Sequence, residues 1–316
     1  MIATLPDGNS PLYAYENFAE VDFIVTDLDG TLVVGKDPVL KQIKDSIARL
    51  KRKQIQVTVA TGRTYCGAKA RMQELGISRG MPVALYNGGL VVEYGTGNIL
   101  HADYIPCGVI QALLRTTDLH KSTIYAYTVS STIPFLFSDR DDYIREEVYA
   151  WGNLRKDRDV NGMAVRHLQA GDLFEKKISA ILIEDNMSLE EKQIIMEVLQ
   201  RYSCIRITDS GSGFMEIKGG GRNNGKDKGI INDILKGEKY SAKKILAIGD
   251  NDNDVELFKS ADISVAVGNT SDLAREYADY VCERNNAEGF SDMLRVLEDA
   301  KRYCGGKNEE YGEFRR

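Results

Sequence analysis

Short runs of β-branched and aromatic residues alternate along this chain with longer segments in which hydrophobic residues recur every three or four positions. A continuous hydrophobic run is typical of a strand that is covered on both faces, and Phe23–Thr26 has this pattern. Residues 38–53 carry Val39, Ile43 and Ile47 on one helical stripe. The alternation predicts an α/β protein in which helices connect parallel strands.

The same alternation continues in two separate parts of the chain. Before residue 88 the pattern predicts strands at 56–60 and 82–86 and a helix at 65–75. After residue 218 it predicts helices at 228–235, 254–260 and 289–301, and strands at 244–248, 263–267 and 279–282. We expect residues 1–87 and 218–316 to form one doubly wound, mainly parallel, Rossmann-like sheet with its helices.

Between these two parts, at residues 88–217, the pattern changes. Strands at 90–94 and 98–102 flank a Gly-Thr-Gly turn, which is typical of an antiparallel hairpin. Further strands are expected at 124–129, 135–138 and 178–184. An amphipathic helix at 188–201 begins with Ser188 and Glu191 in the spacing of a capping box. We expect an inserted α+β domain here.

Composition and charge exclude several classes of protein. A chain of 316 residues with 43% hydrophobic content can bury a core, and a net charge of −6 without a basic cluster argues against a nucleic-acid partner. The five cysteines form no close pairs, as expected of reduced thiols. There is no signal-peptide pattern and no apolar run of the roughly 20 residues that a membrane span needs. We expect a cytoplasmic protein without a membrane partner, and the sequence gives no indication of its oligomeric state.

Acidic residues follow two of the predicted strands. Asp27 and Asp29 come directly after the first strand, where Gly30 permits a sharp turn, and Asp250 and Asp254 follow the strand at 244–248. The carboxyl ends of parallel strands meet at one edge of a sheet, where ligands bind. A turn and a cap would be the structural explanation of the first pair alone, but two such clusters indicate a divalent cation that offsets their charge.

The cation expected from these residues is Mg²⁺, which binds few carboxylates together with water and phosphate oxygens. A calcium loop is the alternative, since Asp250, Asp252 and Asp254 have its opening spacing. Such a loop also needs Gly at its sixth position and Glu at its twelfth, and this chain has Val255 and Ala261 there.

Taken together, these motifs resemble the haloacid dehalogenase superfamily. The resemblance rests on Asp27-Leu28-Asp29-Gly30-Thr31, Thr61 with Gly62-Arg63, Lys228-Gly229, and Gly249-Asp250-x-x-Asn253-Asp254, in this order. The inserted segment resembles the large α/β cap of the Cof-type subgroup, which is rich in sugar-phosphate phosphatases. A carboxylate at the position of Asp29 favours phosphoryl transfer over dehalogenation.

The chemistry of phosphoryl transfer, and the resemblance, suggest a role for each motif. Asp27 is expected to attack phosphorus and form an aspartyl phosphate, while Asp29 acts as the acid and then the base. Thr61 and Lys228 are expected to stabilise the transferring phosphoryl group. Lys226 is the alternative lysine, and Lys228 is preferred because Gly229 follows it.

The metal and substrate ligands are expected near the same motifs. Asp27, Asp250 and the backbone carbonyl of Asp29 are the expected metal ligands, and Asp254 is expected to support the metal indirectly. Asn253 is expected to orient phosphate or Asp27. Other candidates for contact with the phosphate or the rest of the substrate are Gly62, Arg63, Asn87 and Gly88, although Arg63 has the alternative of pairing with a carboxylate of the fold.

The sequence therefore predicts a Mg²⁺-dependent phosphatase of a small phosphorylated metabolite, with sugar phosphates as the leading substrate class. A sugar phosphomutase is the alternative enzyme, because it uses the same chemistry. A non-catalytic metal-binding or regulatory protein on this fold is the alternative from another class. Nothing in the sequence selects the particular metabolite.

Overall fold

The computed structural model describes residues 3–35, 37–117, 122–131, 144–152, 163–168, 176–184, 187–209, 214–220 and 227–304. The chain divides into two compact units. Unit 1 comprises Met1–Thr61, Lys69–Gly88 and Lys226–Arg316, and unit 2 comprises Gly62–Ala68 and Gly89–Gly225. Lys226 and the strand predicted at 135–138 lie outside the described residues.

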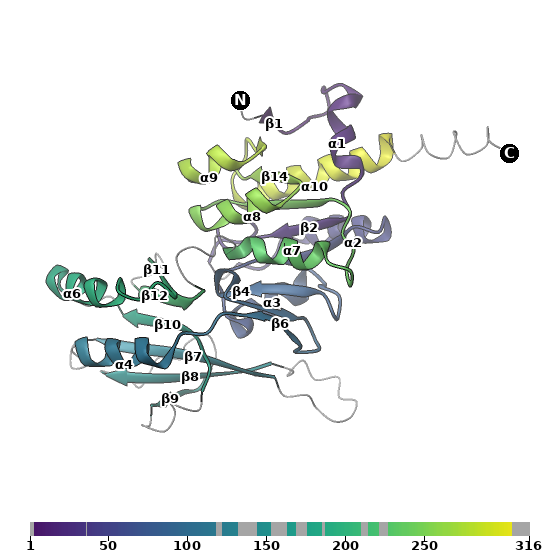
Figure 1. Ribbon diagram of the computed structural model, residues 1–316. Coiled ribbons are helices and arrows are strands. Elements are labelled where there is room, and N and C mark those ends of the chain that lie inside the picture. Colours follow the sequence, from purple (N-terminus) through teal and green to yellow (C-terminus); the bar gives the residue numbers. More distant parts are fainter. Residues whose placement is uncertain are drawn as a thin grey trace. The chain divides into compact units, whose positions relative to one another are not determined.

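Unit 1 is built on a parallel sheet with the strand order β1-β15-β14-β13-β2-β3. Strands β1, β14 and β2 of this sheet are labelled in Figure 1. An isolated parallel bridge between Ala60 and Ala84 links the end of β3 to β4. The central strands β2, β13 and β14 are buried at every position, as expected of strands covered on both faces. The strands are β1 (Ala3–Thr4), β2 (Phe23–Thr26), β3 (Gln56–Val59), β4 (Pro82–Leu85), β13 (Ile245–Gly249), β14 (Ile263–Ala266) and β15 (Tyr280–Val281).

Helices connect these strands in two packed groups. In one group α2 contacts α10, and α10 contacts α1, while in the other α8 contacts both α7 and α9. The helices are α1 (Glu16–Ala19), α2 (Lys41–Arg52), α7 (Ile230–Lys236), α8 (Val255–Ser260), α9 (Asp272–Tyr277) and α10 (Asn286–Tyr303). The short 3-10 helices are η1 (Leu12–Tyr15), η2 (Tyr86–Gly88), η3 (Asp227–Gly229) and η4 (Asp252–Asp254). Helix α3 (Tyr65–Glu74) has residues in both units.

Unit 2 contains a mainly antiparallel sheet with the order β11-β12-β10-β7-β8-β9, in which only β8 and β9 pair in parallel among the described strands. Its strands are β7 (Thr123–Ser131), β8 (Ile144–Gly152), β9 (Val165–His167), β10 (Ile178–Glu184), β11 (Ile205–Asp209) and β12 (Phe214–Gly219). The predicted hairpin is present as β5 (Leu90–Glu93) and β6 (Ile99–Ala102).

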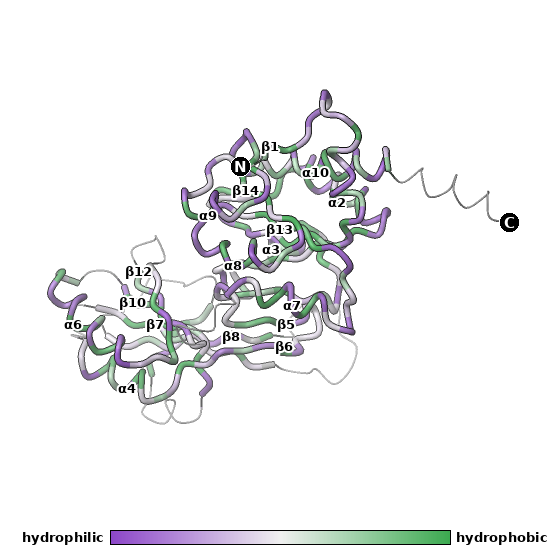
Figure 2. The backbone as a smooth tube through the Cα atoms, turned by 45° about the horizontal axis from the view of Figure 1, so that its top comes forward, coloured by the Kyte–Doolittle hydropathy of each residue, from purple (hydrophilic) through white to green (hydrophobic). Residues whose placement is uncertain are grey.

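Two helices of unit 2, α4 (Cys107–Thr116) and α6 (Leu189–Leu199), pack against each other and share a hydrophobic core with the sheet. Figure 2 shows hydrophobic and hydrophilic stretches alternating along both helices, as expected where one face is buried. The capping box predicted for α6 is confirmed, because the Ser188 hydroxyl accepts from the Glu191 N–H and the Glu191 carboxylate accepts from the Ser188 N–H.

The predicted α/β class with a parallel sheet is confirmed. The predicted domain boundaries at residues 88 and 217 stay a prediction. Among the described residues, no helix is long and apolar enough to cross a membrane.

Candidate active site

Asp27 lies at the carboxyl end of β2, the strand beside β13 in the sheet. Its N–H donates to the Ile248 carbonyl over 3.0 Å, which continues the pairing of the two strands by one residue. Its side chain is only 6% exposed. The backbone therefore holds this carboxylate at the edge of the sheet, out of most solvent.

The loop after β2 turns sharply and passes close to Asp250. Gly30 has φ +83°, and a Cβ atom at this position would overlap the Asp250 carboxylate. The hydroxyl of Thr31 donates to Asp250 Oδ1 over 2.6 Å. Asp29 is exposed, and its backbone forms an isolated bridge with Val33. Gly30 therefore lets this loop approach the second acidic loop closely.

The second acidic loop follows β13 and is organised by Asp254. Asp254 Oδ2 accepts hydrogen bonds from the N–H groups of Asp250 at 2.9 Å and Asn251 at 3.0 Å. A Cβ atom at Gly249 would overlap the Asp254 side chain, so the strand must end in glycine here. Asp254 is fully buried and fixes the direction in which Asp250 leaves the strand.

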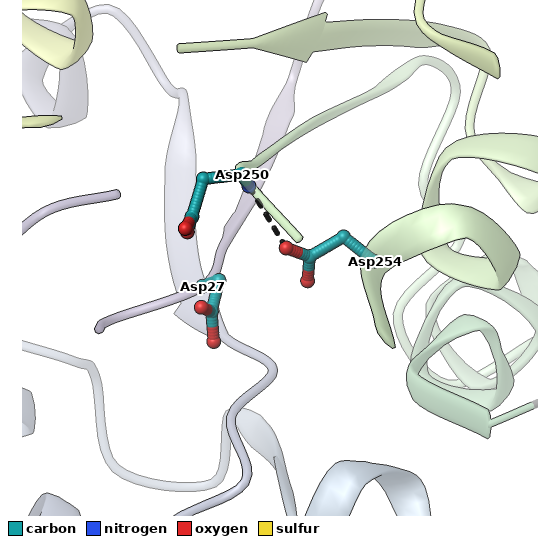
Figure 3. Close-up of side chains that lie close together, drawn as sticks. All are labelled: Asp27, Asp250 and Asp254. Atoms are coloured by element: carbon teal, nitrogen blue, oxygen red, sulfur yellow. Dashed lines mark hydrogen bonds between the residues drawn. The ribbon is translucent and has the colours of Figure 1, made fainter. Parts of the chain in front are cut away.

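The two loops bring Asp27, Asp250 and Asp254 together. Each offers a carboxylate oxygen, and the three oxygens lie within 4.8 Å of one another. Figure 3 shows the three side chains close together, with the hydrogen bond from the Asp250 N–H to the Asp254 carboxylate as a dashed line. Asp252, which a calcium loop would also use, is exposed and accepts from the Ser271 hydroxyl. The acidic cluster therefore combines residues about 220 positions apart in the sequence.

Lys228 supplies a buried positive charge beside this cluster. Its Nζ atom lies 2.8 Å from Asp27 Oδ1 and 2.7 Å from Asp254 Oδ1. It lies on η3, and Gly229 allows η3 to pack closely on α8, since a Cβ atom there would overlap the Glu256 carbonyl. The lysine preferred from the sequence thus contacts two of the acidic residues.

Burial changes the ionisation of these groups. It raises the pKa of Asp27 above its ordinary value, although Lys228 opposes the rise. It also raises the pKa of Asp250 to about 6, against the hydrogen bond from Thr31. For Lys228, burial lowers the pKa, but the carboxylates of Asp254 and Asp27 outweigh it and raise the pKa overall. Three carboxyl groups thus share one buried lysine, and ionising all three together requires further positive charge.

The charge and the donor atoms fit a hard divalent cation. Carboxylate oxygens are the ligands that such ions prefer, and a second positive charge would let Asp27 and Asp250 ionise together. Both oxygens of Asp254 already have partners, namely Lys228 on one and two backbone N–H groups on the other. Asp27 and Asp250 are therefore the carboxylates of the cluster best placed to bind an ion directly.

Four further predicted residues lie on neighbouring segments of unit 1. Thr61 is buried, and its carbonyl accepts from the Asn87 N–H over 3.0 Å. The Asn253 Nδ2 group donates to Asn87 Oδ1 over 3.0 Å. Asn87 has a left-handed backbone with φ +52°, and Gly88 follows with φ +88°, packed so closely on the Asp227 backbone that a Cβ atom would overlap it. These contacts hold the third and fourth motifs against the end of β4.

Gly62 and Arg63 group with unit 2. The Arg63 guanidinium donates to the Gly67 carbonyl over 3.1 Å, within the same segment. The sequence did not assign a role to Thr31, although its motif contains this residue. A hydroxyl four residues after Asp27, within the same motif, is a signal that could have identified it.

The strand order, the acidic cluster and the buried lysine define a phosphoryl-transfer class of α/β enzyme. The sequence model of the haloacid dehalogenase-like hydrolase family matches residues 24–294 of this chain. The chain belongs to this family, as the order of its motifs indicated.

Named relatives agree with the family and with the enzyme class. The 5-amino-6-(5-phospho-D-ribitylamino)uracil phosphatase YcsE of Bacillus subtilis is 21% identical over 283 residues, which cover 87% of this chain and 95% of that protein. The pyridoxal phosphate phosphatase YbhA of Escherichia coli is 22% identical over 271 residues, which cover 86% and 96%. The prediction of a phosphatase of this family is confirmed at the level of enzyme class.

The fold has counterparts among solved structures. The crystal structure of a haloacid dehalogenase-like hydrolase from Bacteroides thetaiotaomicron matches with a TM-score of 0.68 and 21% sequence identity. The match covers 88% of this chain and 99% of that one, so the likeness extends over both units.

Proposed function

We propose that this chain is a Mg²⁺-dependent phosphatase that hydrolyses a small phosphorylated metabolite through an aspartyl phosphate on Asp27. The observation that supports this most directly is the convergence of three carboxylates on one point, next to the buried ammonium group of Lys228. Phosphoryl transfer from a monoester requires a nucleophile and positive charge around the phosphate oxygens, and these residues can supply both.

Asp27 and Asp29 have different roles in breaking the ester bond, the first as nucleophile and the second as acid and base. The Asp27 carboxylate attacks phosphorus, so that a new O–P bond forms as the bond to the leaving oxygen breaks. Asp29 gives its proton to that oxygen and later takes one from the water that hydrolyses the acyl phosphate. Its exposed position just before the turn at Gly30 suits a group that must exchange protons.

Positive charge and hydrogen bonds would hold the phosphoryl group during this exchange. Lys228 and the Thr61 hydroxyl are the proposed donors to its oxygens. A divalent cation bound by Asp27, Asp250 and the Asp29 carbonyl would offset the negative charge that phosphate brings to the site. Asp254 supports both arrangements, because it binds Lys228 and the backbone of the Asp250 loop.

We propose a sugar phosphate as the substrate. One relative acts on a phosphate carried by a ribityl chain, as its name states, which supports a polyhydroxylated substrate here. Asn253, held by Asn87, is proposed to bind phosphate. Gly62, Arg63 and Gly88 stay proposed substrate contacts on the basis of their place beside the motifs in the sequence. We also propose that the insert at 88–217 is a cap that governs substrate choice, and that the protein acts in the cytoplasm, where its five free cysteines would stay reduced.

Phosphate release from a panel of sugar phosphates and an aryl phosphate, with Mg²⁺ and with a chelator, tests the proposal. We expect turnover only with the metal, and a loss of at least about a thousand-fold in kcat for Asp27→Asn. Asp45→Asn, on the exposed face of α2, is the matched control and should retain activity. Absence of phosphate release from every compound would contradict the proposal, and isomerisation of a hexose phosphate without release would favour the phosphomutase.

A further inference from the structure

Residues 268–271, which lie in the loop between β14 and α9, contact both acidic loops of unit 1. We call this segment the bridging loop. Strand β14 lies beside β13, and β2 lies on the other side of β13, so the loops after β14, β13 and β2 are neighbours at one edge of the sheet. A segment that leaves β14 can therefore reach the β2 loop only across the loop that carries Asp250.

Asn269 connects the bridging loop to the loop after β2, the more distant of the two acidic loops in the strand order. Its Nδ2 group donates to the Gly30 carbonyl over 2.9 Å. Its Oδ1 atom accepts from the N–H of Asn286, at the start of α10, over 2.7 Å. Both ends of the Asn269 amide are thus occupied, and the side chain ties the first acidic loop to a long helix of unit 1.

Ser271 holds the second acidic loop. Its N–H donates to the Asp250 carbonyl over 2.8 Å, and its hydroxyl donates to Asp252 Oδ1 over 2.6 Å. The same hydroxyl accepts from the Ala274 N–H and caps α9. The bridging loop is itself anchored, because the Gly268 N–H donates to the Arg284 carbonyl.

These contacts matter because the carboxylates that they bring together repel each other. Asp27 and Asp250 come from separate loops, and ionising both carboxyl groups without a cation between them favours separation of those loops. The Thr31 hydroxyl also links the loops, but it occupies an oxygen of Asp250. The bridging loop links them through Asn269, which donates to the Gly30 carbonyl, and through the Ser271 N–H, which donates to the Asp250 carbonyl. Neither contact uses a carboxylate oxygen of the acidic cluster.

We infer that the bridging loop sets the spacing of the two metal-binding loops, and that Asn269 is a positioning residue for the divalent cation. This inference rests on the proposed function, since it assumes that Asp27 and Asp250 share an ion. Groups that hydrogen-bond to metal ligands typically change metal affinity about 10-fold to 100-fold when they are removed. Asn269 holds the residue next to Asp29, whose carbonyl is a proposed ligand, so we expect an effect at the lower end of that range.

The test is Mg²⁺ binding by isothermal titration calorimetry to the full chain and to Asn269→Ala. We expect the variant to bind Mg²⁺ about 10-fold more weakly. The control is Thr270→Ala. Among the described residues, the Thr270 hydroxyl makes one hydrogen bond, a long one of 3.5 Å to the carbonyl of the neighbouring Ser271. This control should bind Mg²⁺ like the wild type.

Two further measurements separate positioning from general damage. Thermal unfolding of the metal-free proteins should change little, because the Asn269 side chain is exposed. High Mg²⁺ concentrations should restore kcat of Asn269→Ala toward that of the wild type, which a merely structural defect would not allow. If Asn269→Ala does not fold, Ser271→Ala takes its place, with weaker Mg²⁺ binding again expected.

The outcomes distinguish this inference from the proposed function. A wild-type chain that binds no Mg²⁺ would overturn the proposed metal site and the inference with it. A wild type that binds Mg²⁺ and a folded Asn269→Ala that binds it equally well would overturn only the role of the bridging loop.

Discussion

The ammonium group of Lys228 lies between two buried carboxylates, Asp27 and Asp254. A buried ion pair adds little net stability by itself, since both groups lose their hydration, but removing one partner leaves an uncompensated charge. Here one cation has two anionic partners, at 2.8 and 2.7 Å. Its removal should therefore affect folding as well as catalysis.

Lys228→Met should lower the free energy of unfolding by about 3–5 kcal/mol at neutral pH, because Asp27 and Asp254 lose their common partner. Lys236→Met is the matched control, since Lys236 pairs with Asp262 at the surface, where both side chains are more than 30% exposed. The control should cost under about 1 kcal/mol. Urea denaturation measures both, and equal losses would contradict the role given to Lys228.

Burial raises the pKa of Asp250 from an ordinary 3.8 to about 6, and this shift determines how the stability of the metal-free protein changes with pH. In the metal-free folded protein Asp250 keeps its proton between about pH 4 and pH 6, whereas the unfolded chain has released it. Rising pH over this range therefore removes stability, and Asp27, whose pKa is also raised by burial, acts in the same direction. The thermal unfolding midpoint in chelator, followed over this range, measures the effect.

The same protons compete with the metal. Mg²⁺ needs the carboxylates ionised, so we expect its affinity to rise with pH and its binding to release protons. Calorimetric titrations in two buffers of different ionisation enthalpy would count the released protons. Binding that is independent of pH, with no proton release, would show that these carboxyl groups are not the ligands.

At the level of elements, the turn after β2 depends on Gly30. This residue combines a left-handed backbone with a position against the Asp250 carboxylate, so a side chain there meets two obstacles. Gly35, on the same connection, also has a left-handed backbone, with φ +58°. Apart from its two chain neighbours, no described residue has an atom within 4 Å of the Cβ position there. The pair separates the effect of backbone conformation from that of close approach.

Gly30→Ala should weaken Mg²⁺ binding strongly, because the two acidic loops must move apart to admit the methyl group. Gly35→Ala should cost roughly 1–2 kcal/mol of stability from its backbone and leave Mg²⁺ binding unchanged. Titration calorimetry and urea denaturation of both variants provide the comparison. Equal Mg²⁺ affinities in the two variants would show that the close approach at Gly30 does not matter.

At the level of the whole molecule, the residues of the acidic cluster all belong to unit 1, whereas Trp151, the only tryptophan, lies on β8 in unit 2. Binding to the folded state stabilises it by about 2.7 kcal/mol when the ligand is at 100 times its dissociation constant. Because the chain contains two compact units, a ligand of unit 1 need not stabilise unit 2 equally.

We expect such a Mg²⁺ concentration to raise the urea midpoint seen by far-UV circular dichroism more than the midpoint seen by Trp151 fluorescence. A chelator should reverse the shift, and Asp250→Asn should abolish it. Equal shifts by both probes would show that the two units unfold as one. No shift by either probe would contradict the metal site.

Local patterns determined much of the fold in advance. Strands β2 and β10 have the predicted limits, because mainly hydrophobic runs specify buried strands. The capping box at Ser188 was equally visible, since its hydrogen bonds join residues three positions apart. Helix α9, which the sequence analysis did not predict, has six residues, too few to establish a helical period.

The amino-acid sequence by itself determined which strands end in acidic residues, and its motif order identified the family. Only the tertiary structure decided that β13 lies beside β2, that Lys228 contacts both Asp27 and Asp254, and that Asn269 reaches the Gly30 carbonyl. The physical reason is the separation in sequence over which each kind of interaction acts. Hydrophobic period and turn chemistry act between residues a few positions apart, whereas strand order and the packing of loops at a sheet edge join residues more than 200 positions apart.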